Sequence, residues 1–155
     1  MIHVSNELLV NEGQERKLTR DDVWRGLEMK ANNALPFVPA MTKCEVIERR
    51  SEHDFDRDVE FRGQAFVERI TLEPKHRVIF NRLSGKVLGT IANELFERDG
   101  ELVLRFSYSL LLEGVEADSP EEQEYADGMA GDYLKALAAT LDAMRKVAAG
   151  ETAEA

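Results

Sequence analysis

The sequence predicts an α+β fold in which a curved antiparallel sheet wraps around one long C-terminal helix. Apolar and polar residues alternate with period two from Thr42 to about Gly114, which is typical of strands with one buried face. Short breaks with turn residues divide this stretch, so consecutive strands must pair antiparallel. A helical pattern from Ser119 to about Ala148 follows. It is long enough to cover the buried face of the sheet.

The N-terminal part predicts one strand and one helix. Residues 2–11 alternate as a strand does. Thr19 opens the helix, and Asp22 three residues later completes a form of the capping box, with Asp in place of the usual Glu. The helix has one apolar face, because apolar residues recur at spacings of three and four: Val23, Trp24, Leu27 and Ala31.

Six strands are predicted in the central stretch. They lie near residues 42–50, 54–62, 65–73, 76–83, 89–98 and 101–113. The strongest hairpin signal is Asp99-Gly100, a dipeptide that favours two-residue turns. Gly89 is a candidate β-bulge, and a bulge there would move every later side chain to the opposite face of the sheet.

The last helix has clear start signals. Ser119 is a favourable N-cap and Pro120 suits the first helical position. We expect a single domain over residues 1–149 and a disordered tail over residues 150–155.

Composition excludes several classes of partner. The chain has 20 Lys and Arg against 30 Asp and Glu, a net charge of −10. That charge argues against nucleic-acid binding and against anionic membrane surfaces. Cys44 is the single cysteine, the N-terminus lacks signal-peptide features, and no apolar run is long enough for membrane insertion. We expect a cytoplasmic protein.

No motif indicates a metal, a cofactor or a catalytic nucleophile. Asp54, Asp56 and Asp58 have the spacing of a calcium loop, but Val59 stands where that loop requires glycine. Their alternation along residues 54–62 instead predicts that these aspartates lie on the solvent face of a strand. The three histidines have no zinc-site spacing. We therefore predict no cofactor, no metal site and no catalytic residue.

Polar residues interrupt the apolar phases of four strands. Arg57 lies between Phe55 and Val59, and similar interruptions occur at Glu68, Arg82 and Asn93. If these phases face the interior, each polar group needs a partner, because an unpaired buried charge is strongly unfavourable. One interpretation is a polar floor that orients a ligand. The other is a structural role, either as an internal ion pair, Arg57–Glu68 or Arg82–Glu68, or as residues near strand ends that reach water.

Other candidates come from the apolar phases themselves. Tyr108 is in phase with Phe106, and Tyr133 is on the apolar stripe of the last helix. Their hydroxyls are predicted either to enter a pocket or to belong to core tyrosines whose hydroxyls reach the surface or a carbonyl group. The complete set of predicted ligand-binding residues is Arg57, Phe66, Glu68, Phe80, Arg82, Asn93, Phe106, Tyr108, Met129, Tyr133 and Leu137.

Five short stretches carry a family resemblance: residues 18–24 (LTRDDVW), 37–39 (FVP), 68–74 (ERITLEP), 89–93 (GTIAN) and 104–106 (LRF). In this order the chain resembles the helix-grip fold of the START and Bet v 1-like (SRPBCC) superfamily, which includes the PR-10 allergens. Within it, the chain resembles the AtaL-like group of small bacterial proteins. The resemblance covers most of residues 2–148 and implies a deep cavity for lipids, sterols, polyketides or similar molecules. The glycine-rich loop of PR-10 proteins is absent, since Ser84-Gly85-Lys86 contains one glycine.

The resemblance and the residues together give three functional hypotheses. The leading one is non-catalytic binding of a small apolar molecule, such as a lipid, polyketide or aromatic metabolite, between the sheet and the C-terminal helix. The alternative is a polyketide cyclase or aromatase, with Arg57, Glu68 and Tyr108 as candidate residues. The third is an adaptor that binds a protein partner. An edge strand could also pair two copies into a homodimer.

Overall fold

The computed structural model describes residues 2–14 and 17–149, with the backbone alone at Tyr133. The elements in chain order are β1 (Ile2–Leu9), α1 (Arg20–Asn32), β2 (Met41–Ser51), β3 (Asp54–Phe61), β4 (Gln64–Glu73), β5 (Arg77–Arg82), β6 (Val87–Arg98), β7 (Glu101–Leu112) and α2 (Pro120–Ala148). Every predicted strand and helix is present, with ends that differ by no more than two residues. The predicted tail at 150–155 lies outside the described residues.

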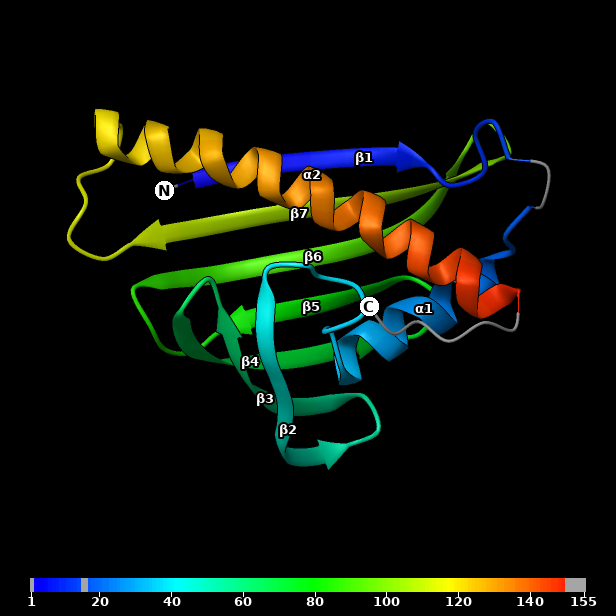
Figure 1. Ribbon diagram of the computed structural model, residues 1–155, viewed down its shortest axis with the longest axis horizontal. Coiled ribbons are helices and arrows are strands. Elements are labelled where there is room, and N and C mark those ends of the chain that lie inside the picture. Colours follow the sequence, from blue (N-terminus) through cyan, green and yellow to red (C-terminus); the bar gives the residue numbers. More distant parts are fainter. Residues whose placement is uncertain (1, 15–16, 150–155) are drawn as a thin grey trace.

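All seven strands belong to one antiparallel sheet with the order β1-β7-β6-β5-β4-β3-β2 (Figure 1). Strands β2 to β7 form the predicted meander, and β1 pairs with β7. The edges of the sheet are therefore β1 and β2. A homodimer formed through either edge stays a prediction.

The predicted bulge at Gly89 is wrong, because the pairing register runs without a shift from β5 through Gly89 to β7. Gly89 has a φ of 138°, a backbone conformation that residues other than glycine rarely adopt. A Cβ atom there would lie 2.1 Å from the carbonyl oxygen of Ser109. Glycine therefore permits the close approach of β7, and the side chains beyond it keep the predicted phase.

Both helices pack against the sheet. Figure 1 shows α2 running obliquely across β1 and β7, with α1 near its C-terminal end. Buried side chains of both helices and of the sheet form one core cluster. At Gly26 of α1, a Cβ atom would lie 2.3 Å from Cγ of Met144 in α2, so the two helices touch there. Within the described part of the chain, neither helix is long and apolar enough to cross a bilayer.

The helix starts agree with the sequence signals. Thr19 accepts a hydrogen bond from the backbone N–H of Asp22, and the Asp22 carboxylate accepts one from the backbone N–H of Thr19. This is the predicted capping box. Ser119 caps α2 by accepting from the N–H of Glu122, and Pro120 opens the helix.

One aspartate on the outer face of the sheet is less exposed than alternation predicts. Asp56 is only 6% exposed, because the guanidinium groups of Arg50 and Arg69 cover it at 2.8 and 3.0 Å. Hydrogen bonds from Arg50, then from Arg69, lower the pKa of Asp56 to about 2. The outer face at this point is an ion-pair cluster.

Candidate functional site

A cavity lies between the inner face of the sheet, the C-terminal end of α1 and the middle of α2. Water-sized molecules can occupy about 150 Å³ of it, and the empty space including the open mouth is about 840 Å³. The smaller volume is that of the inner chamber, and the larger one includes solvent at the mouth. An apolar cavity of about 150 Å³ is large enough to hold a benzene ring.

The chamber has an apolar floor. Four consecutive strands, β4 to β7, each contribute one large apolar side chain to it: Phe66, Phe80, Ile91 and Phe106. Each of these side chains is 6% exposed or less. Their alternation on neighbouring strands puts them on the same face of the sheet. The floor is therefore suited to a flat apolar or aromatic molecule.

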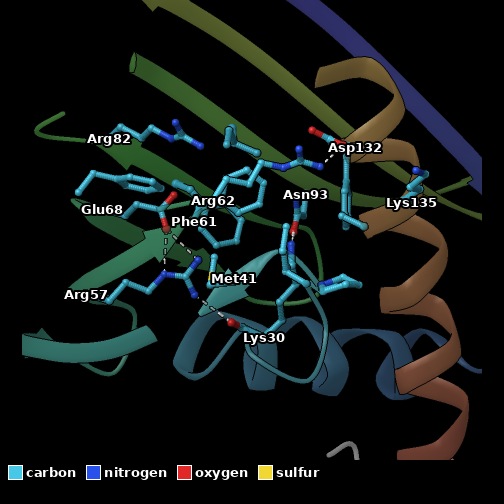
Figure 2. Close-up of a pocket in the computed structure, with 18 residues that line it drawn as sticks. Lys30, Met41, Arg57, Phe61, Arg62, Glu68, Arg82, Asn93, Asp132 and Lys135 are labelled. Atoms are coloured by element: carbon cyan, nitrogen blue, oxygen red, sulfur yellow. Dashed lines mark hydrogen bonds and ion pairs between the residues drawn. The ribbon is translucent and has the colours of Figure 1, made fainter. Parts of the chain in front are cut away.

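The mouth lies between the loop at residues 38–41, the β3–β4 hairpin and α2. Arg62 at the hairpin donates a hydrogen bond to Asp132 of α2, with 2.5 Å between Nη2 and Oδ1 (Figure 2). The side chain of Arg62 is 58% exposed, so this ion pair adds little stability. It does join the two elements on either side of the opening.

Arg57 and Glu68 form a buried ion pair at the edge of the chamber (Figure 2). They are cross-strand partners on β3 and β4, and both are 3% exposed or less. Nε and Nη2 of Arg57 donate to Oε1 of Glu68 at 3.0 and 2.9 Å. Of the two interpretations left open by the sequence, the internal Arg57–Glu68 ion pair is present.

The same guanidinium also fixes α1. Nη1 of Arg57 donates to the carbonyl oxygens of Lys30 and Ala31, each at 3.0 Å. These carbonyls belong to the last turn of α1, where intrahelical partners run out. Arg57 therefore caps the helix from the sheet and positions the side chain of Lys30 over the cavity.

Lys30 is the central polar residue of the chamber, and the sequence analysis missed it. It is only 6% exposed, and its Nζ donates to Oδ1 of Asn93 at 2.6 Å. The same Nζ stands 4.3 Å from the ring centre of Phe106 and 5.0 Å from that of Phe80. No carboxylate of the described residues lies within ion-pair distance of it.

These surroundings change the proton affinity of Lys30. Burial, and then the positive charge of Arg57, lower the pKa of Lys30 from 10.5 to about 7. Both the neutral amine and the ammonium ion are therefore populated at neutral pH. The sequence did contain a signal for this residue: Val23, Leu27 and Lys30 have the i, i+4, i+7 spacing of one helix face.

Asn93 completes the polar group. Its side chain is 0% exposed and lines the cavity. Oδ1 accepts from Lys30, while Nδ2 has no hydrogen-bond partner among the residues that the structure describes. A buried donor without a partner costs about 1–3 kcal/mol. Nζ of Lys30 and Nδ2 of Asn93 are thus neighbouring donors beside an apolar chamber.

Most of the predicted ligand-binding residues lie around this cavity. Seven line it among the described residues: Arg57, Phe66, Glu68, Phe80, Arg82, Asn93 and Phe106. The guanidinium of Arg82 lies 4.2 Å from the ring centre of Phe66. Met129 lines an adjoining hollow between α2 and the β3–β4 hairpin. The side chain of Tyr133 lies outside the described part of the chain.

Two predicted residues are not part of the cavity lining. Tyr108 and Leu137 are 2% and 0% exposed and belong to the core cluster. They do not reach the cavity because α2 and the sheet enclose them in the packed core. Burial raises the pKa of Tyr108 to about 12, so its hydroxyl stays protonated. Tyr108 is a core tyrosine, which was the second of the two interpretations for it.

The cavity is basic although the protein is acidic. Of the described residues that line it, five are basic (Lys30, Arg57, Arg62, Arg82 and Lys135) and two are acidic (Glu68 and Asp132). Each of the two carboxylates is engaged by an arginine. Within residues 2–14 and 17–149, no three His, Cys, Asp or Glu side chains are grouped as metal ligands would be.

Comparisons with known proteins agree with this architecture. Residues 4–150 match the AtaL family, described as acetylaranotin biosynthesis cluster protein L. The ZhuI aromatase/cyclase from Streptomyces sp. R1128 superposes with a TM-score of 0.68 at 20% identity, over 97% of this chain and 98% of that one. A START superfamily protein from Mycobacterium smegmatis gives 0.68 at 12% identity, over 92% and 98%. Ara h 8.0201 gives 0.58 at 11%, over 90% and 97%. No curated protein matches the sequence. The helix-grip fold predicted from the sequence is confirmed.

Proposed function

The chain belongs to the AtaL family, and from this premise we propose that it binds a small, mainly apolar molecule between the sheet and α2. One observation carries the proposal: a chamber floored by Phe66, Phe80, Ile91 and Phe106 opens to solvent beside α2. Apolar pockets with a few convergent polar groups are typical ligand sites. The family description, which names a biosynthesis cluster, favours a metabolite over a membrane lipid, and the similarity to an aromatase/cyclase is in keeping with a polyketide or aromatic one.

The chamber also limits the affinity. A ligand that buries about 300 Å² of apolar surface gains about 7 kcal/mol at about 25 cal/mol per Å². The lost freedom of ligand and side chains offsets part of this gain. We expect dissociation constants near the micromolar range for a ligand that makes only apolar contacts.

Native mass spectrometry of protein purified gently from cell extract tests the proposal. We expect an additional mass that is lost on denaturation and that identifies the ligand class. The natural amount of ligand is then compared in two variants of α2. Ala136→Phe adds a ring at a residue that lines the cavity, and Ala138→Phe adds the same ring at an exposed position.

The two variants separate cavity binding from surface binding. We expect the adduct to disappear from Ala136→Phe and to remain on Ala138→Phe, with circular dichroism confirming that both are folded. An adduct that survives in both variants would place the ligand elsewhere. A clean 17.5 kDa species or its multiples in repeated extracts would contradict tight binding of a cellular ligand.

A second candidate function is cyclisation of a polyketide-like chain, and the amine of Lys30 favours it. With a pKa of about 7, part of this amine is neutral and able to act as a base near neutral pH. It would remove a proton from a carbon between two carbonyl groups. That carbon would bond to another carbonyl carbon of the same chain, and the resulting alkoxide would regain the proton from the ammonium. Loss of water would then give an aromatic ring.

Substrate analogues with several β-carbonyl groups test this second function. Turnover by the wild type that is lost in Lys30→Met and retained in Tyr108→Phe would support it, because Tyr108 lies in the core and not at the cavity. Binding of the analogue without turnover would leave the protein as a binder alone.

A further inference from the structure

We propose that the ligand carries an acidic oxygen, a carboxylate, phenolate or enolate, and that this oxygen binds between Nζ of Lys30 and Nδ2 of Asn93. The inference rests on the proposed binding of an apolar molecule and names its chemical class. The ligand is an apolar ring system with one anionic oxygen.

Unused hydrogen-bonding capacity supports this placement. Nδ2 of Asn93 is buried and has no acceptor among the described residues. Lys30 donates to one amide oxygen, and its ammonium faces two aromatic rings. Glu68 attracts that charge from beyond ion-pair distance, while the larger effect of Arg57 opposes it. An oxygen atom in the chamber would accept from both donors. A charged oxygen gains more than a neutral carbonyl, since charge-assisted hydrogen bonds are about twice as strong.

The charge around the cavity has the matching sign. Both carboxylates of the lining are engaged by Arg57 and Arg62, so neither competes for the amine of Lys30. The lining keeps an excess of basic groups inside a protein of net charge −10. A low-dielectric cavity with one sign of charge concentrates ligands of the opposite sign.

The remainder of the ligand is defined by what surrounds the donors. Nζ of Lys30 lies over the rings of Phe106 and Phe80. The part of the ligand next to its anionic oxygen therefore packs against these two rings and must be apolar. A small hydrophilic anion would leave that floor uncovered. A neutral hydrocarbon would leave Nδ2 of Asn93 without an acceptor, which is unfavourable.

Proton uptake is the signature of this arrangement. At pH 8 most of the Lys30 amine is neutral, since its pKa is about 7. An anion placed beside it favours the ammonium form. Binding of a ligand that is already ionised must therefore take about 0.9 proton from solvent at pH 8. The neutral form of the same ligand takes none.

The test uses 2-naphthoate and its neutral amide, 2-naphthamide, which have nearly the same shape. Titration calorimetry at pH 8 in two buffers of different ionisation enthalpy gives both the affinity and the number of protons taken up. We expect the wild type to bind naphthoate about ten- to a hundredfold more tightly than naphthamide. We expect proton uptake with naphthoate only.

Three variants locate the preference. Lys30→Met should bind the two probes equally and without proton uptake. Asn93→Asp should lose naphthoate and keep naphthamide, because its carboxylate takes the place of the ligand oxygen at Lys30. Lys146→Met removes an exposed lysine of α2 that does not line the cavity, and it should behave as the wild type.

The outcomes separate this inference from the function beneath it. Equal affinity for both probes in the wild type, or a preference that survives in Lys30→Met, would overturn the acidic ligand while leaving an apolar binder. Failure of both probes to bind the wild type would overturn the binding proposal and this inference with it.

Discussion

Replacing Lys30 by methionine should change how the stability of the protein depends on pH. Lys30 is 6% exposed, and its amine has no ion-pair partner among the described residues. Methionine is similar in length and leaves an apolar side chain in an apolar place. The substitution removes one buried titratable group, while the other titratable groups are the same in both proteins.

The magnitude follows from the proton affinity of the amine. The pKa of Lys30 is lowered from its ordinary value of 10.5 to about 7 by burial. At about 1.4 kcal/mol for each tenfold change, this corresponds to about 5 kcal/mol as an upper bound. Between these two pH values the unfolded chain binds more protons than the folded protein, so stability rises with pH. Below pH 7 the buried ammonium destabilises the fold by the full amount, and above pH 10.5 this destabilisation is absent because the amine is neutral in both states.

Urea unfolding of both proteins at intervals from pH 6 to pH 10 measures the effect. Above pH 7, the free energy of unfolding of the wild type should rise relative to that of Lys30→Met by about 1.4 kcal/mol per pH unit. Near pH 7 the Lys30→Met protein should be the more stable one by about 2–4 kcal/mol. It no longer buries the ammonium, which costs up to about 5 kcal/mol, but Asn93 loses its donor at a cost of about 1–3 kcal/mol. A difference between the two proteins that stays constant over this range would refute the reasoning, since it would mean a solvated amine of ordinary pKa.

Three further substitutions test the rest of the structure. Glu68→Gln leaves the Arg57 charge buried without a counter-charge and should cost about 3–5 kcal/mol of stability in urea unfolding; a loss below about 1 kcal/mol would contradict the buried pair. Gly26→Ala gains about 1 kcal/mol of helix propensity, but the new methyl group must displace Met144. We therefore expect a net loss of stability of about 1–2 kcal/mol. This loss should be absent when the substitution is made in a Met144→Ala background. Asp56→Asn should remove the part of acid unfolding that occurs as pH falls from 3.8 to about 2, because the ion pairs of Asp56 stabilise the fold only above that range; identical acid unfolding curves for both proteins would exclude this role.

The fold was predictable because its signals are local. Alternation along each strand, the Asp99-Gly100 turn and the Thr19 and Ser119 caps each determine a few residues, and the short connections then make β2 to β7 a meander. The pairing of β1 with β7 was not predicted, because a long stretch of sequence separates these two strands. The outer-face prediction for Asp56 was incomplete for a related reason. Alternation gives the face of a side chain, but it does not tell which neighbouring arginines cover it.

The candidate site was predictable in part. Arg57 and Glu68 were found because they interrupt apolar phases of strands. Lys30 interrupts the apolar face of α1 in the same way, but it was not predicted, because a lysine near the end of a helix usually extends its amine to solvent. Tyr108 has the same phase as Phe106, yet it lies in the core. The alternation phase of a strand predicts which face of the sheet a side chain lies on. It does not predict at which residues α2 packs against that face and at which it leaves a cavity.

The pairing of β1 with β7 has a consequence for synthesis of the chain. Ile2 is opposite Leu110, so β1 leaves the ribosome before the other strands of this sheet and must wait for β7, the last of them. At about 5–20 residues per second this delay is of the order of 5–20 seconds. Strands β2 to β6 can meanwhile pair with their neighbours as they emerge. The nascent chain therefore carries an open strand with the apolar side chains of Ile2, Val4 and Leu8 unprotected, and such strands attract other chains. A substitution that slows the formation of β7 would thus lower the yield of soluble protein in cells even where the finished fold tolerates it.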